Sequence, residues 1–274
     1  MRNPRRIAAL ITQALVWLKS PRADFQTIHD VADAYEARFR RAVMSAFEDG
    51  ANIAEQHLLL MSHEHVSNVM DQVLSTIKKS LGEVLEDVIR NVFNAGGKAA
   101  VKRLKSRLRI SAAKDDTGIS KDLKFDVTNP RAIEWARKHA ADLVINITDT
   151  TRDKIRELVE AAFEEQFTVD DLRKEIDDLV ADPDRAETIA RTEVISASNA
   201  GQKELWNQAV DEEILTGREK KEWIVTPDDK LCPICEPMDG VQVGLDEDFQ
   251  LNTGDRVDTP PAHPRCRCAV GLAL

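Results

Sequence analysis

Two long series of apolar residues, each repeating every third or fourth position, constrain the fold of this chain most strongly. One series runs through Phe25–Phe47 and the other through Val66–Val92, which as a helix would extend about 40 Å. A repeat of this kind places its apolar side chains on one side of a helix. We therefore expect two long helices packed against each other or against a partner protein, with breaks at Asp49-Gly50 and Ser62–His65.

The composition agrees with a helix-rich chain, because only 5% of the 274 residues are aromatic and 31% are charged. The length suits one large domain or two of ordinary size. No run of 18 apolar residues occurs, which argues against a transmembrane helix. Residues 1–18 are first basic and then apolar at helical spacing, which favours an amphipathic first helix over a signal peptide and so a cytosolic origin.

Charge is divided unevenly along the chain. Residues 1–112 carry 17 Lys and Arg against 12 Asp and Glu, whereas residues 113–274 carry 21 against 36. Six of the twelve residues in 98–109 are basic. This segment fits a solvated helix face and, equally well, a contact with DNA phosphates or an acidic protein surface. The residues that would make such a contact are Lys98, Lys102, Lys105 and Arg109.

A polar segment without periodicity, residues 113–124, is the predicted linker or exposed loop between domains. Beyond it, Asn129-Pro130 and Asp182-Pro183 each place a capping residue before a proline at the first helical position. Further helix starts are predicted at Thr148 or Asp149 and at Thr168. The predicted fold is α+β and mostly α: long N-terminal helices, a helix-rich domain, and a small β subdomain resembling a zinc knuckle at the C-terminus.

All four cysteines lie in the last 43 residues, in two close pairs. One pair has the C-x2-C spacing of a zinc half-site, and the other is a C-x-C pair whose side chains point to the same side of an extended chain. Four soft ligands in two pairs fit a closed tetrahedral Zn²⁺ site with a structural role. Disulfides and free thiols are the competing interpretations. The candidate ligands are Cys232, Cys235 and Cys266, with Cys268 or His263 as the fourth.

The series "IARTEVISASNAG", "EWIVTPDDKLCPICEPMDG" and "PPAHPRCRC" resembles the Mu F-like minor head proteins of tailed phages, also described as phage head morphogenesis proteins. The resemblance covers roughly residues 125–270, so residues 125–274 are the expected Mu F-like domain. Residues 1–112 match no motif. Beside the cysteines and His263, the matching positions are Arg191, Thr192, Glu193, Trp223, Asp229, Gly240, Pro261, Pro264 and Arg267.

This resemblance implies a non-enzymatic minor capsid protein that acts in head assembly at the portal and in DNA packaging or delivery. The implied partners are the portal protein, the major capsid protein and phage DNA, without a membrane span. The implied location is the interior of the virion head, with the host cytoplasm as the place of assembly. Residues 1–112 would then form a long-helix region that docks on the portal or the inner capsid wall.

Two other classes of function compete with this interpretation. Arg191 and the pair Thr192-Glu193, with a distant strand, could imitate an ADP-ribosyltransferase site, and the acidic run of residues 164–178 could suggest a metal-dependent nuclease. Such a run is more often a solvated face, and the sequence has neither a Gly-rich phosphate loop nor an H-E-x-x-H motif. The other class is a free zinc adaptor that binds nucleic acid.

Overall fold

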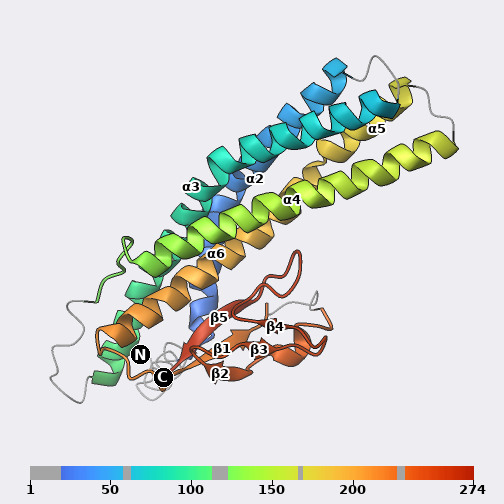
Figure 1. The fold of residues 1–274 in the computed structure, drawn as a ribbon. Coiled ribbons are helices and arrows are strands. Elements are labelled where there is room, and N and C mark those ends of the chain that lie inside the picture. The colour runs from blue at the N-terminus through green and yellow to red at the C-terminus, as the bar shows by residue number, and fades with distance from the viewer. Residues whose placement is uncertain (1–19, 58–62, 113–122, 166–168, 227–231) are drawn as a thin grey trace, which may run out of the picture. The chain divides into compact units, whose positions relative to one another are not determined.

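The structure is a computed structural model that describes residues 20–57, 63–112, 123–165, 169–226 and 232–274. Helices dominate the described residues and short antiparallel strands follow them near the C-terminus, which confirms the predicted mostly helical α+β class (Figure 1). The helices are α2 (Ala23–His57), α3 (His63–Ala112), α4 (Pro130–Glu164), α5 (Val169–Val180) and α6 (Pro183–Asp211). The strands are β1 (Lys220–Ile224), β2 (Gln242–Gly244), β3 (Phe249–Gln250), β4 (Arg256–Val257) and β5 (Ala269–Ala273).

Two of the predicted helix starts carry the expected caps. The Arg131 N–H donates to Asn129 Oδ1 at 2.9 Å, immediately before α4. The Asp184 N–H donates to Asp182 Oδ1 at 2.9 Å at the start of α6. In both cases the side-chain oxygen satisfies a backbone donor that the first helical turn leaves without a partner. The N-cap followed by proline was therefore a correct signal at both positions.

Two predicted interruptions are wrong, because the helices continue through them. Thr148 was expected to open a new helix, but its hydroxyl donates to the Val144 carbonyl at 2.7 Å inside α4, as a mid-helix threonine can do. Likewise α2 runs through Gly50 to His57. A Cβ on Gly50 would lie 2.5 Å from Ile77 Cγ1, so the glycine there lets α2 and α3 approach each other.

The chain forms two compact units, each built from segments far apart in sequence. The first contains residues 1–35, 91–133 and 192–274, and the second contains residues 36–90 and 134–191. Both units thus combine residues from either side of segment 113–124, most of which lies outside the described residues. The division into an N-terminal region 1–112 and a domain 125–274 stays a prediction.

In the first unit, β1 is the central strand of a three-stranded antiparallel sheet with the order β2-β1-β5. Trp223 of β1 pairs with Val270 of β5, and both are fully buried. The Trp223 ring also meets Phe249 of the β3–β4 hairpin edge to face, with 5.2 Å between ring centroids. The C-terminal strands therefore share one small apolar core.

Helices α3 and α6 approach each other very closely in the first unit. A Cβ on Gly201 would lie 2.0 Å from the carbonyl oxygen of Phe93, and one on Gly96 would lie 2.5 Å from that of Ser198. Only glycine allows two helix backbones to come this near. The glycine that ends the "SASNAG" motif is therefore explained by a contact with a helix about 100 residues earlier in the chain.

A buried ionic network in the first unit joins α2, α3 and β5. The Asp24 carboxylate accepts hydrogen bonds from Arg107 Nη1 at 3.2 Å and from the Leu272 N–H at 3.1 Å. Arg107 Nη2 in turn donates to the Leu272 carbonyl at 2.5 Å. Burial raises the pKa of Asp24, although Arg107 and the Leu272 N–H favour its charged form. The network fixes β5 to the beginning of α2 and the end of α3.

In its described residues, the second unit contains helices and no strand. Its core contains fully buried side chains of α2 and α3, including Phe39, Phe47, Ile77 and Leu81. The guanidinium of Arg185 in α6 lies over the Phe47 ring, 4.9 Å from its centroid. None of the helices in the described parts of the chain combines the length and hydrophobicity that a membrane crossing needs.

Candidate metal centre

The first cysteine pair lies on a tight turn of the first unit. The N–H groups of Cys235 and Glu236 both donate to the Cys232 carbonyl, at 3.1 and 2.9 Å. The Cys235 N–H also lies 3.3 Å from Cys232 Sγ, so the turn supplies a donor to that sulfur. A short 3-10 turn (Glu236–Met238) and Gly240, with φ of +77°, then lead the chain into β2. The predicted knuckle-like turn is therefore present.

A second turn supplies the other donors. The Cys266 N–H donates to the His263 carbonyl at 3.1 Å, which brings both side chains to the same side. Arg265 lies between them in the left-handed region with φ of +63°. Its N–H donates to Thr192 Oγ1 of α6 at 3.0 Å, and this bond holds the turn in place. Thr192, a residue of the family motif, thus helps to fix the turn that carries His263 and Cys266.

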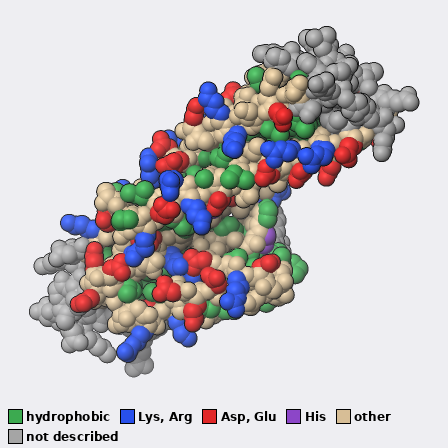
Figure 2. Space-filling view, viewed as in Figure 1, with side chains coloured by type: hydrophobic (Ala, Val, Ile, Leu, Met, Phe, Trp, Pro, Cys, Tyr) green, Lys and Arg blue, Asp and Glu red, His purple; other side chains and the backbone are tan. Residues whose placement is uncertain are grey.

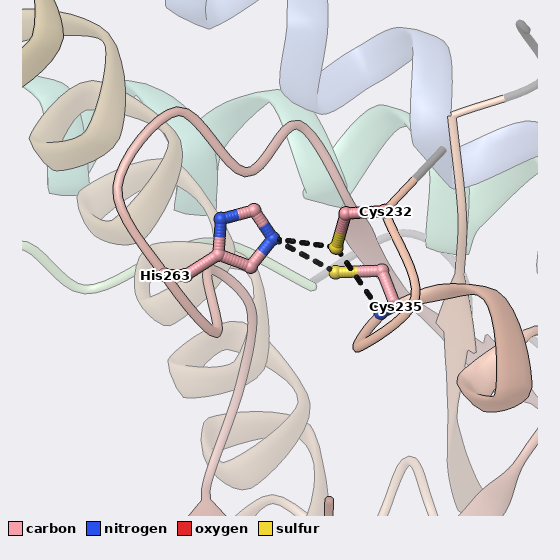
Figure 3. Close-up of side chains that lie close together, drawn as sticks. All are labelled: Cys232, Cys235 and His263. Carbon is pink, nitrogen blue, oxygen red and sulfur yellow. Dashed lines mark hydrogen bonds between the residues drawn. The ribbon is translucent and has the colours of Figure 1, made fainter. Parts of the chain in front are cut away.

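The two turns meet, and five donor atoms gather in two groups of three that share Cys235. His263 Nε2 lies 3.0 Å from Cys232 Sγ and 3.3 Å from Cys235 Sγ (Figure 3). Cys235 Sγ lies 3.7 Å from Cys266 Sγ. Tetrahedral zinc, with bonds of about 2.3 Å to sulfur, separates neighbouring sulfur atoms by about 3.8 Å. Cys235 and Cys266 are therefore spaced as two sulfur ligands of one zinc ion would be, and all four cysteines are unbonded thiols.

The ring orientation of His263 favours it as a ligand. Its Nδ1 lies 2.8 Å from the Pro264 carbonyl, which can only accept a hydrogen bond. Nδ1 must then carry the proton, which leaves the lone pair of Nε2 directed at Cys232 and Cys235 (Figure 3). Metal-bound histidines are held in this way by a hydrogen bond to their other nitrogen.

The thiols influence one another's ionisation strongly. Hydrogen bonds with Cys235 and Cys268 lower the pKa of Cys266, whereas hydrogen bonds with Cys266 and Cys268 raise the pKa of Cys235. Among Cys235, Cys266 and Cys268 the thiolate form is therefore favoured at Cys266 and opposed at the other two, because adjacent thiolates repel. A bound dication removes that repulsion and lets several thiols ionise together.

Residues outside the cysteine motifs hold this loop, and the sequence did not point to them. Asn199 of α6 donates to the carbonyls of Pro260 and Cys268, at 3.1 and 3.3 Å, and accepts from the Val270 N–H at 2.9 Å. His29 of α2 lies 2.9 Å from the Arg267 carbonyl through Nε2. Asn199 is fully buried. A buried asparagine on a helix has no signature in a single sequence until its partners are known.

The other residues of the family motif that the structure describes form contacts within the protein. Arg191 pairs with Glu36 and with Glu187, each at 3.0 Å. Trp223 is buried in the sheet core, Gly240 forms the turn before β2, and Pro261 follows Pro260 through a cis peptide bond. Arg267 contributes its carbonyl, which also accepts from Thr226 Oγ1 at 3.0 Å. Asp229 lies outside the described residues.

Only some of the basic residues that were predicted to contact DNA or an acidic protein are exposed at the surface. Lys98 and Lys102 are exposed and Lys105 is half-buried, whereas the side chain of Arg109 lies outside the description. Arg107 of the same segment is buried against Asp24. On the face drawn in Figure 2, basic and acidic side chains are interspersed rather than gathered by sign.

The acidic run of residues 164–178 does not form a recognised metal site in the part of the chain that the structure describes. The two donor groups with suitable spacing there both belong to the cysteine and histidine cluster. Asp171 and Asp178 of α5 are exposed, as expected for a solvated helix face.

Fold and site together define a helix-rich protein with a small antiparallel β region organised around a cysteine–histidine cluster. Residues 153–271 match the family model described as "Phage Mu protein F like protein", which confirms the resemblance of the C-terminal half. All five candidate metal donors and the supporting Asn199 lie inside the matched segment.

Among curated proteins, the chain is similar to "Uncharacterized protein YqbB" of Bacillus subtilis (strain 168), with 27% identity over 150 residues. The match covers 54% of this chain and 47% of the relative, so it spans about half the length of that protein. No solved structure matches the chain significantly.

Proposed function

We propose that this chain is a minor, non-enzymatic head morphogenesis protein of a tailed phage or prophage. The observation that carries the proposal is the match of residues 153–271 to the phage Mu protein F-like family. It is supported by the surroundings of three motif residues: Arg191 pairs with Glu36, Thr192 accepts from the Arg265 N–H, and Trp223 is buried in the sheet core. Their roles are those of a scaffold.

The metal in this proposal is a structural Zn²⁺ ion held by Cys232, Cys235, His263 and Cys266. Three sulfurs and one imidazole form a common closed zinc site without an open position for catalysis. His263 is preferred over Cys268 as the fourth ligand because the Pro264 carbonyl fixes its ring in the ligating tautomer. Within the folded chain, zinc would tie together two turns that are about 30 residues apart.

The proposed place of action is the portal region inside the head, with the portal protein and the major capsid protein as partners. Exposed Lys98 and Lys102 would meet phage DNA or an acidic protein surface. Packaging or delivery of DNA belongs to the same proposal. These assignments rest on the family match and on the exposure of the two lysines.

The test is the protein content of heads purified from the phage or induced prophage that encodes this chain. Quantitative mass spectrometry of full and DNA-free heads should find the chain in both, at far fewer copies than the major capsid protein. Its absence from both kinds of head would overturn the proposal. Turnover of a nucleotide or of NAD by the purified protein, lost on Glu193→Gln, would replace it with the enzymatic interpretation.

A further inference from the structure

A groove lies between α3 and α4 in the second unit, with a volume of about 320 Å³. Its α3 wall is formed by Lys78, Gly82 and Glu86, and its α4 wall is largely apolar. Ile145 on that wall is 48% exposed, which is unusual for a large aliphatic side chain. The groove lies within a single compact unit, so all of its walls belong to one body.

Gly82 lines this groove, is exposed, and is not explained by packing against any described part of the chain. A Cβ built on it would meet no atom within 4 Å, in contrast to Gly50 and Gly201, which contact neighbouring helices. Glycine in the middle of a helix lowers helix stability, and its usual structural use is a close approach of another backbone. Since no described part of the chain makes that approach, the open space suits a helix from another molecule.

The charges around Gly82 indicate which helix would fit. Lys78 and Glu86 lie four residues before and after Gly82, both are exposed, and no ion pair is recorded for either among the described residues. They are about 12 Å apart along the helix axis, which is too far for them to pair with each other. A second α3 that crosses in the antiparallel direction at Gly82 would place its Glu86 opposite Lys78 and its Lys78 opposite Glu86.

We propose that this groove is the interface of a homodimer with twofold symmetry. The α3 helix of the second copy lies in the groove between α3 and α4, and the symmetry axis passes near Gly82. Such an interface is isologous, so each charge pair occurs twice and each Ile145 is covered by the other copy. The occupant is a second copy because the groove carries its own complementary charges, in the reversed order that an antiparallel partner requires.

The test measures the dimer dissociation constant of the full-length chain by sedimentation velocity over a wide concentration range. The wild-type chain should dimerise reversibly. Lys78→Glu alone, or Glu86→Lys alone, replaces two attractions with two repulsions and should raise the dissociation constant by about tenfold. The double variant Lys78→Glu/Glu86→Lys restores complementarity and should return the constant to within about threefold of wild type.

Two further variants separate the interface from general effects. Lys79→Glu makes the same charge change on the neighbouring residue, which does not line the groove, and should leave the constant unchanged. Gly82→Leu places a large side chain where the two α3 helices would cross. It should abolish the dimer while the helical circular dichroism signal is retained. A wild-type chain that stays monomeric at every concentration, or a double variant as weak as the single ones, would overturn the proposal.

Discussion

At the scale of single residues, side-chain orientation says more than sequence spacing about which members of the cysteine–histidine cluster are suited to bind a metal ion. Cys268 is a member of the C-x-C pair, yet the ring of His263 is the group that its neighbours hold in a ligating orientation. The sequence left these two residues as competitors, because spacing alone allows either to reach the ion. The proposed preference for His263 rests on the hydrogen bond from its Nδ1 to the Pro264 carbonyl.

This preference leads to a prediction for cysteine variants. Cys235→Ser should reduce the zinc content from about one ion per chain to background, whereas Cys268→Ser should retain the ion. Elemental analysis of reduced protein after dialysis would measure both. Loss of zinc in Cys268→Ser together with its retention in His263→Asn would show that Cys268 is the fourth ligand instead.

A second prediction concerns Asp258, which pairs with the fully buried Lys221 and, at 2.6 Å, with Lys203. Burial opposes the charged carboxylate, but the two lysines outweigh it and lower the pKa of Asp258. A carboxyl group whose pKa is lowered by folding stabilises the fold at pH values above its pKa in the unfolded state. This contribution is lost as the pH falls through its pKa in the folded state. Its loss should therefore occur below about pH 4.

Asp258→Asn should then lower the free energy of unfolding at pH 7 by about 1–3 kcal/mol, because it leaves buried Lys221 without a counter-charge. The difference from wild type should shrink as the pH falls below about 4. Denaturant unfolding at several pH values measures this. Asp246→Asn, an exposed acid in the same region, is the control and should change stability by no more than about 0.5 kcal/mol. A pH-independent difference would contradict the ionic explanation.

At the scale of elements, most of the secondary structure follows from local signals and the packing of helices does not. The caps at Asn129 and Asp182 were visible in sequence because they act within one turn. The continuity of α4 through Thr148 was not, since the same threonine can cap a helix or bond to the preceding turn. The partner of Gly201 was equally hidden, because it is Phe93 of another helix.

The same substitution should have opposite effects at Gly201, which lies in the α3–α6 contact, and at Gly82, which lies outside it. Gly201→Ala places a methyl group where the Phe93 carbonyl lies and should destabilise the chain by about 1–3 kcal/mol. Gly82→Ala meets no atom and should stabilise dilute, monomeric protein by about 0.5–1 kcal/mol, since alanine is the better helix former. Thermal unfolding followed by circular dichroism would compare them. Equal effects of the two changes would refute this reading of the packing.

At the scale of the whole molecule, the class of fold and the cysteine cluster were predictable, whereas the two units were not. Apolar stripes, helix caps and a C-x2-C pair are each formed by residues close together in the sequence, so they can be recognised there. The link between Asp24 and Leu272 spans 248 positions and uses common residue types, so nothing in the sequence distinguishes it. For this reason, a boundary at residues 113–124 was the natural expectation even though both units draw on segments from either side of it.

The buried network of Asp24, Arg107 and Leu272 predicts how a truncated chain would behave. A fragment of residues 125–274 lacks Asp24 and Arg107, and also Phe93, against which Gly201 packs. Removing these partners uncovers the apolar side of α6 and β5, so the fragment should lack a cooperative thermal transition and should be cleaved rapidly by protease. A chain that begins at Ser20 keeps all three residues and serves as the control. A fragment that unfolds cooperatively, as the longer chain does, would show that the C-terminal half is autonomous.

The bond between Asp24 and Leu272 also has a consequence for the timing of biosynthesis. A ribosome adding about 5–20 residues per second needs roughly 12–50 s to travel from the first of these residues to the second. Within that interval α2 and α3 are completed once Ala112 has been added, long before β5 and the Cys266 turn exist. The first unit can therefore close only after β5 has been made, and a nascent chain that stalls earlier presents unfinished apolar surfaces to chaperones and proteases.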